Sequence, residues 1–256
     1  MKLYKTEALV LRTRDCGRGD KLLTLYSRKL GKFKVMAHGA ARASSRKRGA
    51  VQLFTRANFL IHRGRELDSV SQCEGVEMFS YLRGDLEKIS YASYLFELVD
   101  VLTPEGEPGE PLYLLLLTTL RLMETEDLEL LARAFEIKAA DYAGYHPILE
   151  NCANCQGSLD GPLGFSPGLG GILCGVCGGS GPDALPCSRG LVEFLKVLRR
   201  WHPSRLRQLK VDSRTRIQLK HLLHEYLKYH LEQEFKSTAF LDRLKSSPAG
   251  TPGTHV

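Results

Sequence analysis

Four of the seven cysteines form two C-x-x-C pairs, Cys152 with Cys155 and Cys174 with Cys177, separated by 18 residues. Each pair makes a tight turn that can present two thiolates to one metal ion, and two such pairs at this spacing are typical of a zinc site. Four sulfur ligands complete a tetrahedron and leave no position open for a catalytic water. The sequence therefore predicts one structural Zn²⁺, with another metal, an iron–sulfur cluster or a redox pair as alternatives.

Other catalytic signatures are missing from the sequence. It contains no Walker A motif, and no H-x-E signature of a zinc deaminase lies near the cysteine pairs. His221, His224 and Glu225 follow the order H-x-x-H-E, which matches no zinc-protease signature, and we interpret both histidines as surface residues of a helix. Cys16, Cys73 and Cys187 are isolated and are expected to be reduced thiols without a special role. We predict that the protein is not an enzyme.

The elements of the first 79 residues are expected to be strands. Apolar residues stand in short runs, separated by a turn signal at 17–20, and residues 32–36 alternate between polar and apolar types. Residues 51–62 and 67–73 supply two more strand candidates. Five short strands without a convincing helix predict a closed OB-fold barrel, with an SH3-like barrel as the alternative.

Helical periodicity begins near residue 80. Helices are expected over 86–102, 112–123, 128–142, 189–201 and 215–235, with Ser188 as the cap of the fourth. The expected organisation is an α+β multidomain protein. It has an OB-fold domain at 1–79, a helical domain at 80–148 and 183–245, and a zinc-binding module at 149–182 inserted between its two parts. Residues 246–256, rich in Ser, Pro and Gly, are expected to be a disordered tail.

Charge is distributed unevenly along the chain, whose net charge is +7. Residues 1–80 contain 17 Lys and Arg against 7 Asp and Glu, residues 81–150 contain 5 against 14, and residues 151–256 contain 14 against 8. A basic barrel indicates a polyanionic partner such as nucleic acid, although a loop kept basic for solubility is the alternative. The candidate DNA contacts are Arg12, Arg14, Lys21, Lys32, Lys34, Arg42, Arg46, Lys47 and Arg48 near the barrel, and Arg199, Arg200, Arg205 and Arg207 in a second cluster.

The sequence also bears on location. No apolar run approaches the roughly 20 residues that span a bilayer. The first five residues carry no apolar segment of a secretory signal. We expect a cytoplasmic protein with no membrane partner and no small-molecule substrate.

Several segments, in this order and at this spacing, resemble the RecO family of bacterial DNA repair proteins. The resemblance covers about residues 3–244, and no single segment carries it alone. The matching segments are 8–14 (ALVLRTR), 19–25 (GDKLLTL), 31–32 (GK), 38–40 (HGA), 64–67 (G-x-x-L), 91–94 (YASY), 102–108 (LTPEGEP), 164–167 (GFSP) between the cysteine pairs, 229–231 (YHL) and 236–237 (KS).

The resemblance implies a recombination mediator without catalytic residues. Such a protein binds single- and double-stranded DNA and anneals complementary strands, including strands coated with single-strand-binding protein (SSB). With RecR, and in some settings RecF, it promotes loading of RecA at gaps. The family also engages the acidic, apolar C-terminal tail of SSB, for which Arg121, Arg133 and Lys138 of the helical domain are the candidates here.

Two other classes share some of these features. A zinc-ribbon protein that binds RNA or assists transcription would have the same barrel, zinc and charge. A metalloenzyme with Cys and His ligands would share only the metal. The nucleic acid that is annealed and the number of bound metal ions distinguish these classes from the mediator.

Overall fold

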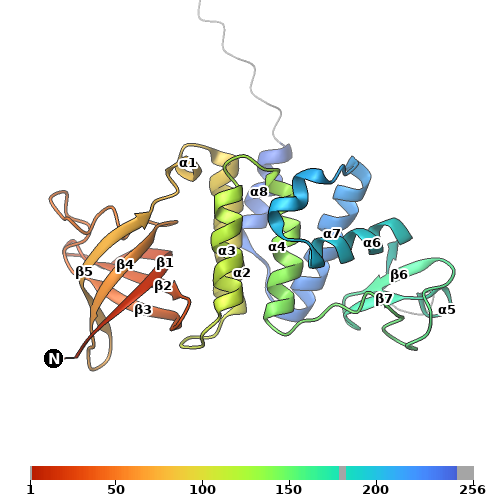
Figure 1. The fold of residues 1–256 in the computed structure, drawn as a ribbon, viewed down its shortest axis with the longest axis horizontal. Helices are drawn as coiled ribbons and strands as arrows, with labels where there is room; N and C mark the ends of the chain where they lie inside the picture. Colours follow the sequence, from red (N-terminus) through yellow and green to blue (C-terminus); the bar gives the residue numbers. More distant parts are fainter. Residues whose placement is uncertain (1, 179–182, 247–256) are drawn as a thin grey trace, which may run out of the picture.

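A computed structural model describes residues 2–178 and 183–246 of the chain (Figure 1). The molecule is elongated, with a β-barrel at one end, helices in the middle and a small cysteine-rich module at the other end. Nearly all of the expected disordered tail lies outside the described residues, and residue 246 is the last residue of a helix.

Five strands close the N-terminal barrel in the order β1-β2-β3-β5-β4. All neighbours are antiparallel except β3 and β5, which pair in parallel through Val35 with Asp68 and Met36 with Ser69. This topology is an OB-type barrel, so the predicted fold class is confirmed. The strands are β1 (Leu3–Asp15), β2 (Lys21–Ser27), β3 (Gly31–Ala37), β4 (Arg56–His62) and β5 (Asp68–Glu77).

The strand expected at 51–62 is wrong in its first part. Residues 51–54 form turns, and β4 begins only at Arg56. The apolar residues of these turns are buried for another reason. Val51 packs into the barrel core, while Phe54 lies edge-on against Phe96 of helix α2 (Leu86–Leu102), with ring centroids 4.9 Å apart. Their apolar character therefore reflects packing into the barrel core or against the helices, and not strand pairing.

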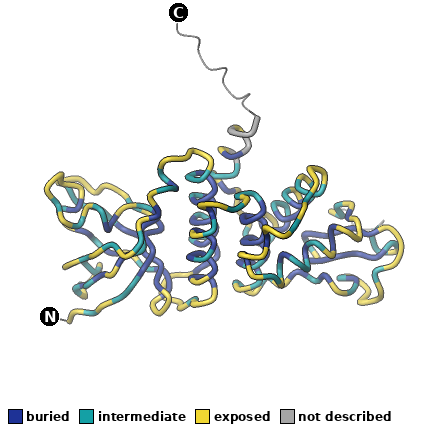
Figure 2. The backbone as a smooth tube through the Cα atoms, turned by 45° about the horizontal axis from the view of Figure 1, so that its top comes forward, coloured by how far each residue is buried: buried dark blue, intermediate teal, exposed yellow. Residues whose placement is uncertain are grey.

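Strand β1 joins two hydrophobic cores because both of its faces are buried. Ala8 and Val10 point into the barrel, whereas Leu9 and Leu11 pack with the helices. A strand that is buried on both sides reads as a continuous apolar run, which explains the four consecutive apolar residues at this point of the sequence. Figure 2 shows the buried backbone continuing from the barrel into the helices.

The helices form the middle of the molecule, and side-chain caps define where several begin. Asp85, Asp127, Ser188 and Asp212 each accept hydrogen bonds from backbone N–H groups of the first turn that follows. The elements are α1 (Ser80–Arg83), α2 (Leu86–Leu102), α3 (Glu110–Leu122), α4 (Leu128–Tyr142), α6 (Arg189–Arg200), the 3₁₀-helix η1 (Pro203–Gln208), α7 (Ser213–Leu231) and α8 (Lys236–Ser246). No helix of the described chain is long and apolar enough to cross a membrane.

The last predicted helix, 215–235, ends earlier in the structure, and a further helix that was not predicted follows it. Helix α7 ends at Leu231, and Glu232 adopts a left-handed conformation with φ of 50°. Helix α8 then starts at Lys236, where the carboxylate of Glu97 accepts hydrogen bonds from the N–H groups of Lys236 and Ser237 at 3.1 and 3.0 Å. A residue of α2 therefore caps α8 across 139 positions of sequence.

The barrel and the helices are joined at the loop between α2 and α3. Gly106 donates its N–H to the carbonyl of Lys32 at 2.8 Å. Gly31 has a φ of 65°, and a Cβ at this residue would lie 2.0 Å from the carbonyl oxygen of Glu107. Only glycine fits there, so the turn between β2 and β3 is fixed against the helical domain.

Candidate metal centre and nucleic-acid interface

The four paired cysteines lie at one end of the small module. Its sheet has the order β7-β6-β8 and consists of β6 (Leu163–Ser166), β7 (Gly171–Leu173) and β8 (Leu185–Cys187), with helix α5 (Gly175–Gly178) after β7. Strand β7 leads directly into Cys174, and the N–H of Ala153 donates to the carbonyl of Ile172 at 2.7 Å. This bond ties the first turn to the second, so the sheet holds both cysteine pairs together.

The sulfur atoms of Cys152, Cys155, Cys174 and Cys177 all lie within 4.8 Å of one another. The Sγ atoms of Cys155 and Cys174 are 3.8 Å apart. A tetrahedral site with metal–sulfur bonds of about 2.3 Å has sulfur–sulfur edges of about 3.8 Å, so this spacing fits such a site. The predicted cluster is therefore brought together and can hold a metal ion.

Backbone and side-chain donors act to favour the thiolate form that a metal requires. The N–H of Cys174 donates to Sγ of Cys152, and the amide of Asn154 donates to Sγ of Cys177, both at 3.4 Å. Burial raises the pKa of the Cys152 thiol, but N–H groups of the two turns outweigh burial and lower this pKa to about 6. At Cys177 the Asn154 amide lowers the pKa, but burial and the neighbouring sulfurs outweigh it and raise this pKa to about 11. Such donors around a sulfur ligand are typical of metal sites in proteins.

The loop between β3 and β4, residues 38–55, carries several cations; we call it the basic loop. Arg42, Arg46 and Arg48 are exposed, and no carboxylate of the described chain lies within 4.0 Å of their guanidinium groups. Lys47 differs, because its ammonium donates to the carbonyl of Val70 at 2.7 Å and fastens the loop to β5. Three of the four predicted contacts of this loop can therefore reach a phosphate.

The strand cations next to the helical domain are largely engaged. Lys32 is buried and forms an ion pair with Asp100 of α2, with 2.9 Å between Nζ and Oδ1. It was predicted as a DNA contact from its charge, but in this structure it joins the barrel to the helices. Arg12 contacts the other oxygen of Asp100 at 2.7 Å, and Lys34 pairs with Glu105.

The remaining barrel candidates lie near the turn between β1 and β2. Lys21 pairs with Asp15 at 2.7 Å, and Arg14 is exposed. The sequence did not single out four further cations, Lys5, Arg28, Lys29 and Arg63, which line a cavity on the barrel together with Arg46 and Lys47. Positive charge along separate strands was the available signal, but only barrel closure shows that these residues lie together.

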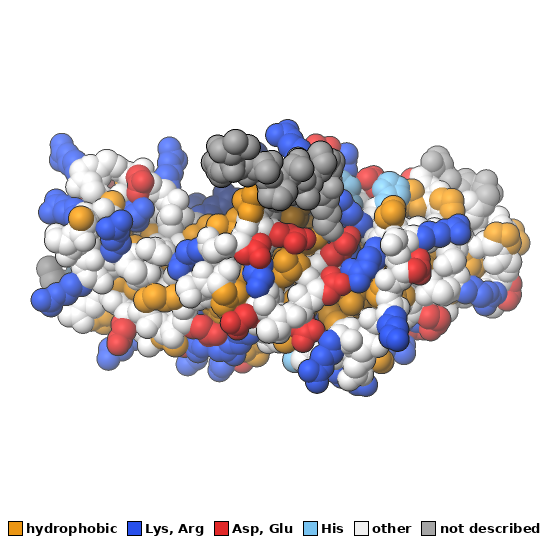
Figure 3. Space-filling view, turned by 90° about the horizontal axis from the view of Figure 1, so that it is seen from above, with side chains coloured by type: hydrophobic (Ala, Val, Ile, Leu, Met, Phe, Trp, Pro, Cys, Tyr) orange, Lys and Arg blue, Asp and Glu red, His pale blue; other side chains and the backbone are white. Residues whose placement is uncertain are grey.

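The second cluster of cations lies around α6 and η1. Arg199 pairs with Asp141 at 3.0 Å, and Arg200 pairs with Glu150 at 2.6 Å. Arg205 lies over the ring of Trp201, 4.4 Å from its centroid, and Arg207 is exposed. In Figure 3, Lys and Arg side chains gather at the barrel end and again toward the cysteine module, with Asp and Glu between them.

The three candidates for partner binding are separated in the structure. Arg121 holds Glu77 through two hydrogen bonds of 2.9 and 2.8 Å, and Lys138 donates to the backbone of Arg199. Arg133 lines a cavity of about 280 Å³ between α2, α4, α7 and α8. The other lining residues are Tyr91, Tyr94, Glu129, Ile217, Lys220, His221, His224, Thr238 and Leu241.

Arg133 forms an ion pair with a buried acid, Glu136. Its guanidinium contacts Oε1 of Glu136 at 2.8 Å, and the hydroxyl of Tyr94 donates to the same oxygen at 2.6 Å. Burial raises the pKa of the Glu136 carboxyl. His221 and His224, interpreted from the sequence as plain surface residues, line this cavity with Arg133. The cavity thus combines apolar walls with several groups that can carry positive charge.

An OB-type barrel with a basic loop, joined to helices and to a cluster of four cysteines that can hold a metal ion, defines the class as a multidomain OB-fold protein. Comparison with known proteins narrows this class. Residues 1–79 match the family model described as Recombination protein O N terminal, and residues 83–239 match Recombination protein O C terminal. The chain belongs to the RecO family of DNA repair proteins.

Curated relatives agree over the full length of the chain. It is 56% identical to the DNA repair protein RecO of Pelotomaculum thermopropionicum, and the match covers all of both chains. It is 43% identical to the RecO protein of Desulforamulus reducens, again over all of both chains. It is 42% identical to that of Desulforudis audaxviator, over 95% of this chain and 98% of the relative. The family resemblance of the sequence is confirmed.

Proposed function

We propose that the protein is a non-enzymatic recombination mediator of DNA repair. It binds single- and double-stranded DNA, anneals complementary strands, including SSB-coated ones, and with RecR and RecF promotes RecA loading at gaps. The observation that carries the DNA-binding part is the basic loop, where Arg42, Arg46 and Arg48 are exposed without an acidic partner among the described residues. When exposed cations without an acidic partner bind a phosphate backbone, the counterions of that backbone are released. Family membership supports the rest.

Annealing needs two strands to approach although their phosphates repel. The barrel supplies one cationic surface, and Arg205 and Arg207 of η1 supply another, while acidic side chains lie over the helices between them (Figure 3). A protein with two such surfaces screens both strands and holds them near each other. This arrangement favours annealing over binding of a single strand alone.

The cysteine centre is proposed to hold one structural Zn²⁺. Four sulfur ligands favour zinc among the common metals, and the sulfur spacing fits its bond lengths. Zinc would stabilise a module whose own apolar cluster, among the described residues, has Cys152, Leu173 and Cys174 as its buried members. Its role is to maintain the fold and not to activate water, because the four ligands complete the coordination.

The cavity beside Arg133 is proposed to bind the SSB C-terminal tail. That tail is acidic with an apolar end, and the cavity offers apolar walls from Ile217 and Leu241 next to Arg133 and Lys220. Arg121 and Lys138 are not part of this proposal, since neither lines this cavity. We place the protein in the bacterial cytoplasm, at the nucleoid, where these partners lie, without a membrane or small-molecule partner.

Charge reversal in the basic loop tests DNA binding. Arg46→Glu with Arg48→Glu is expected to weaken binding to a single strand and to lower the slope of log K against log salt by about 0.7 per lost phosphate contact. The control carries the same charge change far from the barrel, Arg189→Glu with Lys228→Glu, and should keep the slope of the unaltered protein. An unchanged slope in the basic-loop variant would contradict the proposal. Equal binding and annealing of RNA would favour an RNA-binding protein instead.

A further inference from the structure

The outer surface of the barrel has two faces with different electrostatics. OB barrels usually bind nucleic acid on the face of β2 and β3. Here Asp100 contacts both Arg12 and Lys32 next to that face, at 2.7 and 2.9 Å, and Glu105 pairs with Lys34. These acids come from α2 and the loop after it, so carboxylates of the helical domain already neutralise the cations that a phosphate would need.

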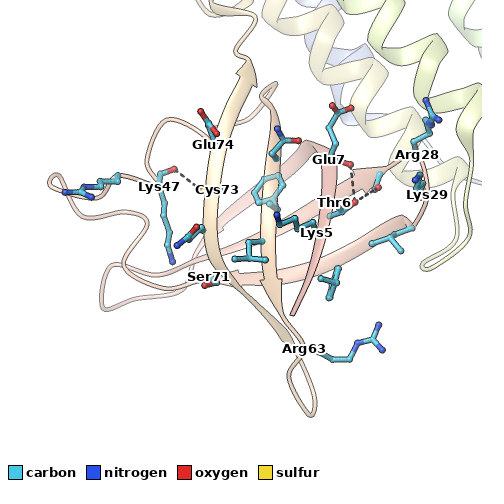
Figure 4. A pocket seen from close by; sticks show the side chains of 18 residues that line it. Lys5, Thr6, Glu7, Arg28, Lys29, Lys47, Arg63, Ser71, Cys73 and Glu74 are labelled. Atoms are coloured by element: carbon cyan, nitrogen blue, oxygen red, sulfur yellow. Dashed lines mark hydrogen bonds between the residues drawn. The ribbon is translucent and has the colours of Figure 1, made fainter. Parts of the chain in front are cut away.

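The other face is hollowed and remains cationic. A cavity of about 1350 Å³ lies along β1, β4 and β5, between the turn after β2 and the basic loop; we call it the barrel groove (Figure 4). In Figure 4, Arg28 and Lys29 lie at the end next to the helices, Lys47 lies on the opposite side, and Arg63 lies below. The cations that line the groove are Lys5, Arg28, Lys29, Arg46, Lys47 and Arg63.

Most of this charge is available to a ligand. Within residues 2–178 and 183–246, no carboxylate lies within ion-pair distance of Lys5, Lys29, Arg46 or Arg63. Arg28 contacts Glu110 at 3.2 Å, at the end of the groove.

Two acids line the groove, and one of them is engaged. Glu7 accepts from Arg56 at 2.7 Å and from the hydroxyl of Tyr113 at 3.0 Å, which lowers the pKa of its carboxyl. Glu74 is the other acid. Cations therefore outnumber acids by six to two in the lining, and the groove attracts an anionic chain.

The walls of the groove also suit bases. Thr6, Asn58, Ser71 and Gln72 present polar groups along it. The hydroxyl of Tyr4 donates to Asp68 at 2.6 Å, which fixes the ring, and the guanidinium of Arg63 lies 5.6 Å from the ring centroid. Stacked planar groups of this kind bind bases without sequence preference.

We infer that the barrel groove, and not the face of β2 and β3, binds single-stranded DNA in this protein. The inference rests on the proposed function and names the surface that binds the single-stranded DNA. A single strand is flexible enough to follow the groove, whereas a duplex is stiff and reaches only its rim. The basic loop borders the groove through Arg46 and Lys47, so both features belong to one path.

Two matched pairs of substitutions separate the two faces. Lys29→Gln with Arg63→Gln removes two charges from the groove, and Arg12→Gln with Lys34→Gln removes two charges from the other face. Affinity for a fluorescent oligothymidine is measured for both variants between 0.05 and 0.3 M salt (concentrations on the order of physiological ionic strength). The groove variant is expected to bind roughly 20-fold more weakly at about 0.1 M salt, with a slope lower by about 1.4, and the other variant is expected to bind like the unaltered protein.

The outcomes distinguish the inference from the proposed function. Equal losses in both variants, or a larger loss on the face of β2 and β3, would overturn the inference while the protein still binds DNA. Failure of the unaltered protein to bind would instead remove the proposed function. A second measurement uses native thiols. The oligonucleotide should slow alkylation of Cys73, which lines the groove, but not of exposed Cys16. Unchanged alkylation of Cys73 would also contradict the groove.

Discussion

The ammonium of Lys32 and the carboxylate of Asp100 form an ion pair of 2.9 Å that joins strand β3 to helix α2. Their side chains are only 11% and 14% exposed, although 68 positions separate them in the sequence. Asp100 also accepts from Arg12 at 2.7 Å. One acid of the helical domain therefore holds two barrel cations, and this contact is one of those that join the barrel to the helices.

Removing the charge of Asp100 should destabilise the protein. Asp100→Asn leaves the nearly buried Lys32 without its counter-ion, and loss of one partner of such a pair costs about 3 kcal/mol. Glu105→Gln breaks the exposed pair with Lys34 and should cost less than about 1 kcal/mol. Urea unfolding measures both. Equal and small changes would show that the pair of Lys32 and Asp100 does not join the domains.

Loss of one sulfur ligand should release the metal and leave DNA binding by the barrel intact. Cys155→Ser is expected to lower bound zinc from one ion per chain to a small fraction and to make the module sensitive to protease. Cys187→Ser is the control, because Cys187 lies in β8 of the same sheet but outside the cluster. Atomic spectroscopy counts the metal. Retention of zinc by the Cys155 variant would exclude the four-cysteine site.

His230 should make the stability depend on pH below about 6.5. Burial lowers the pKa of its imidazole, and a hydrogen bond with the backbone of Pro167 offsets this in part. As pH falls below the ordinary value near 6.5, the unfolded chain binds the proton before the folded chain does, so stability decreases. His230→Gln should reduce this loss, while a variant of exposed His202 should not. Urea unfolding at about pH 7.5 and 5.5 with excess Zn²⁺ measures this loss of stability. An identical loss in the His230 variant and in the unaltered protein would contradict the role of His230.

The cavity beside Arg133 should recognise an acidic peptide. Lys220→Glu replaces one attraction by one repulsion at the cavity, and each exposed contact is worth about 0.7 kcal/mol, so affinity for an SSB tail peptide should fall about tenfold. Lys228→Glu makes the same charge change on the same helix but outside the cavity and should have little effect. Fluorescence anisotropy of the labelled peptide measures both. Equal affinities of the two variants for the peptide would show that the SSB tail binds at another site.

Local signals in the sequence predicted much of the fold. The spacing of the cysteines predicted the cluster that the structure brings together. Helix α4 has the bounds expected from periodicity, and Ser188 caps α6 as expected, because both depend on neighbouring residues. The closed barrel also follows from local strand patterns and turns.

Contacts between distant segments could not be predicted from these local signals. Helix α8 begins where Glu97 of α2 caps it, and no residue next to Lys236 shows this. The sequence around Lys32 indicates a surface cation, because its ion pair with Asp100 of α2 forms only in the fold. Lys29 and Arg63 meet in one groove only because the barrel closes. Charge along the sequence indicates a polyanionic partner, but the fold determines which cations remain available to it.

Annealing on coated DNA tests the mediator function most directly. Complementary oligonucleotides are coated either with intact SSB or with SSB that lacks its C-terminal tail, and the annealing rate is followed with and without the protein. The proposed function predicts faster annealing on intact SSB and little acceleration when the tail is removed. No acceleration on either substrate would contradict the mediator function and leave a basic protein of the RecO family whose role in repair is a different one.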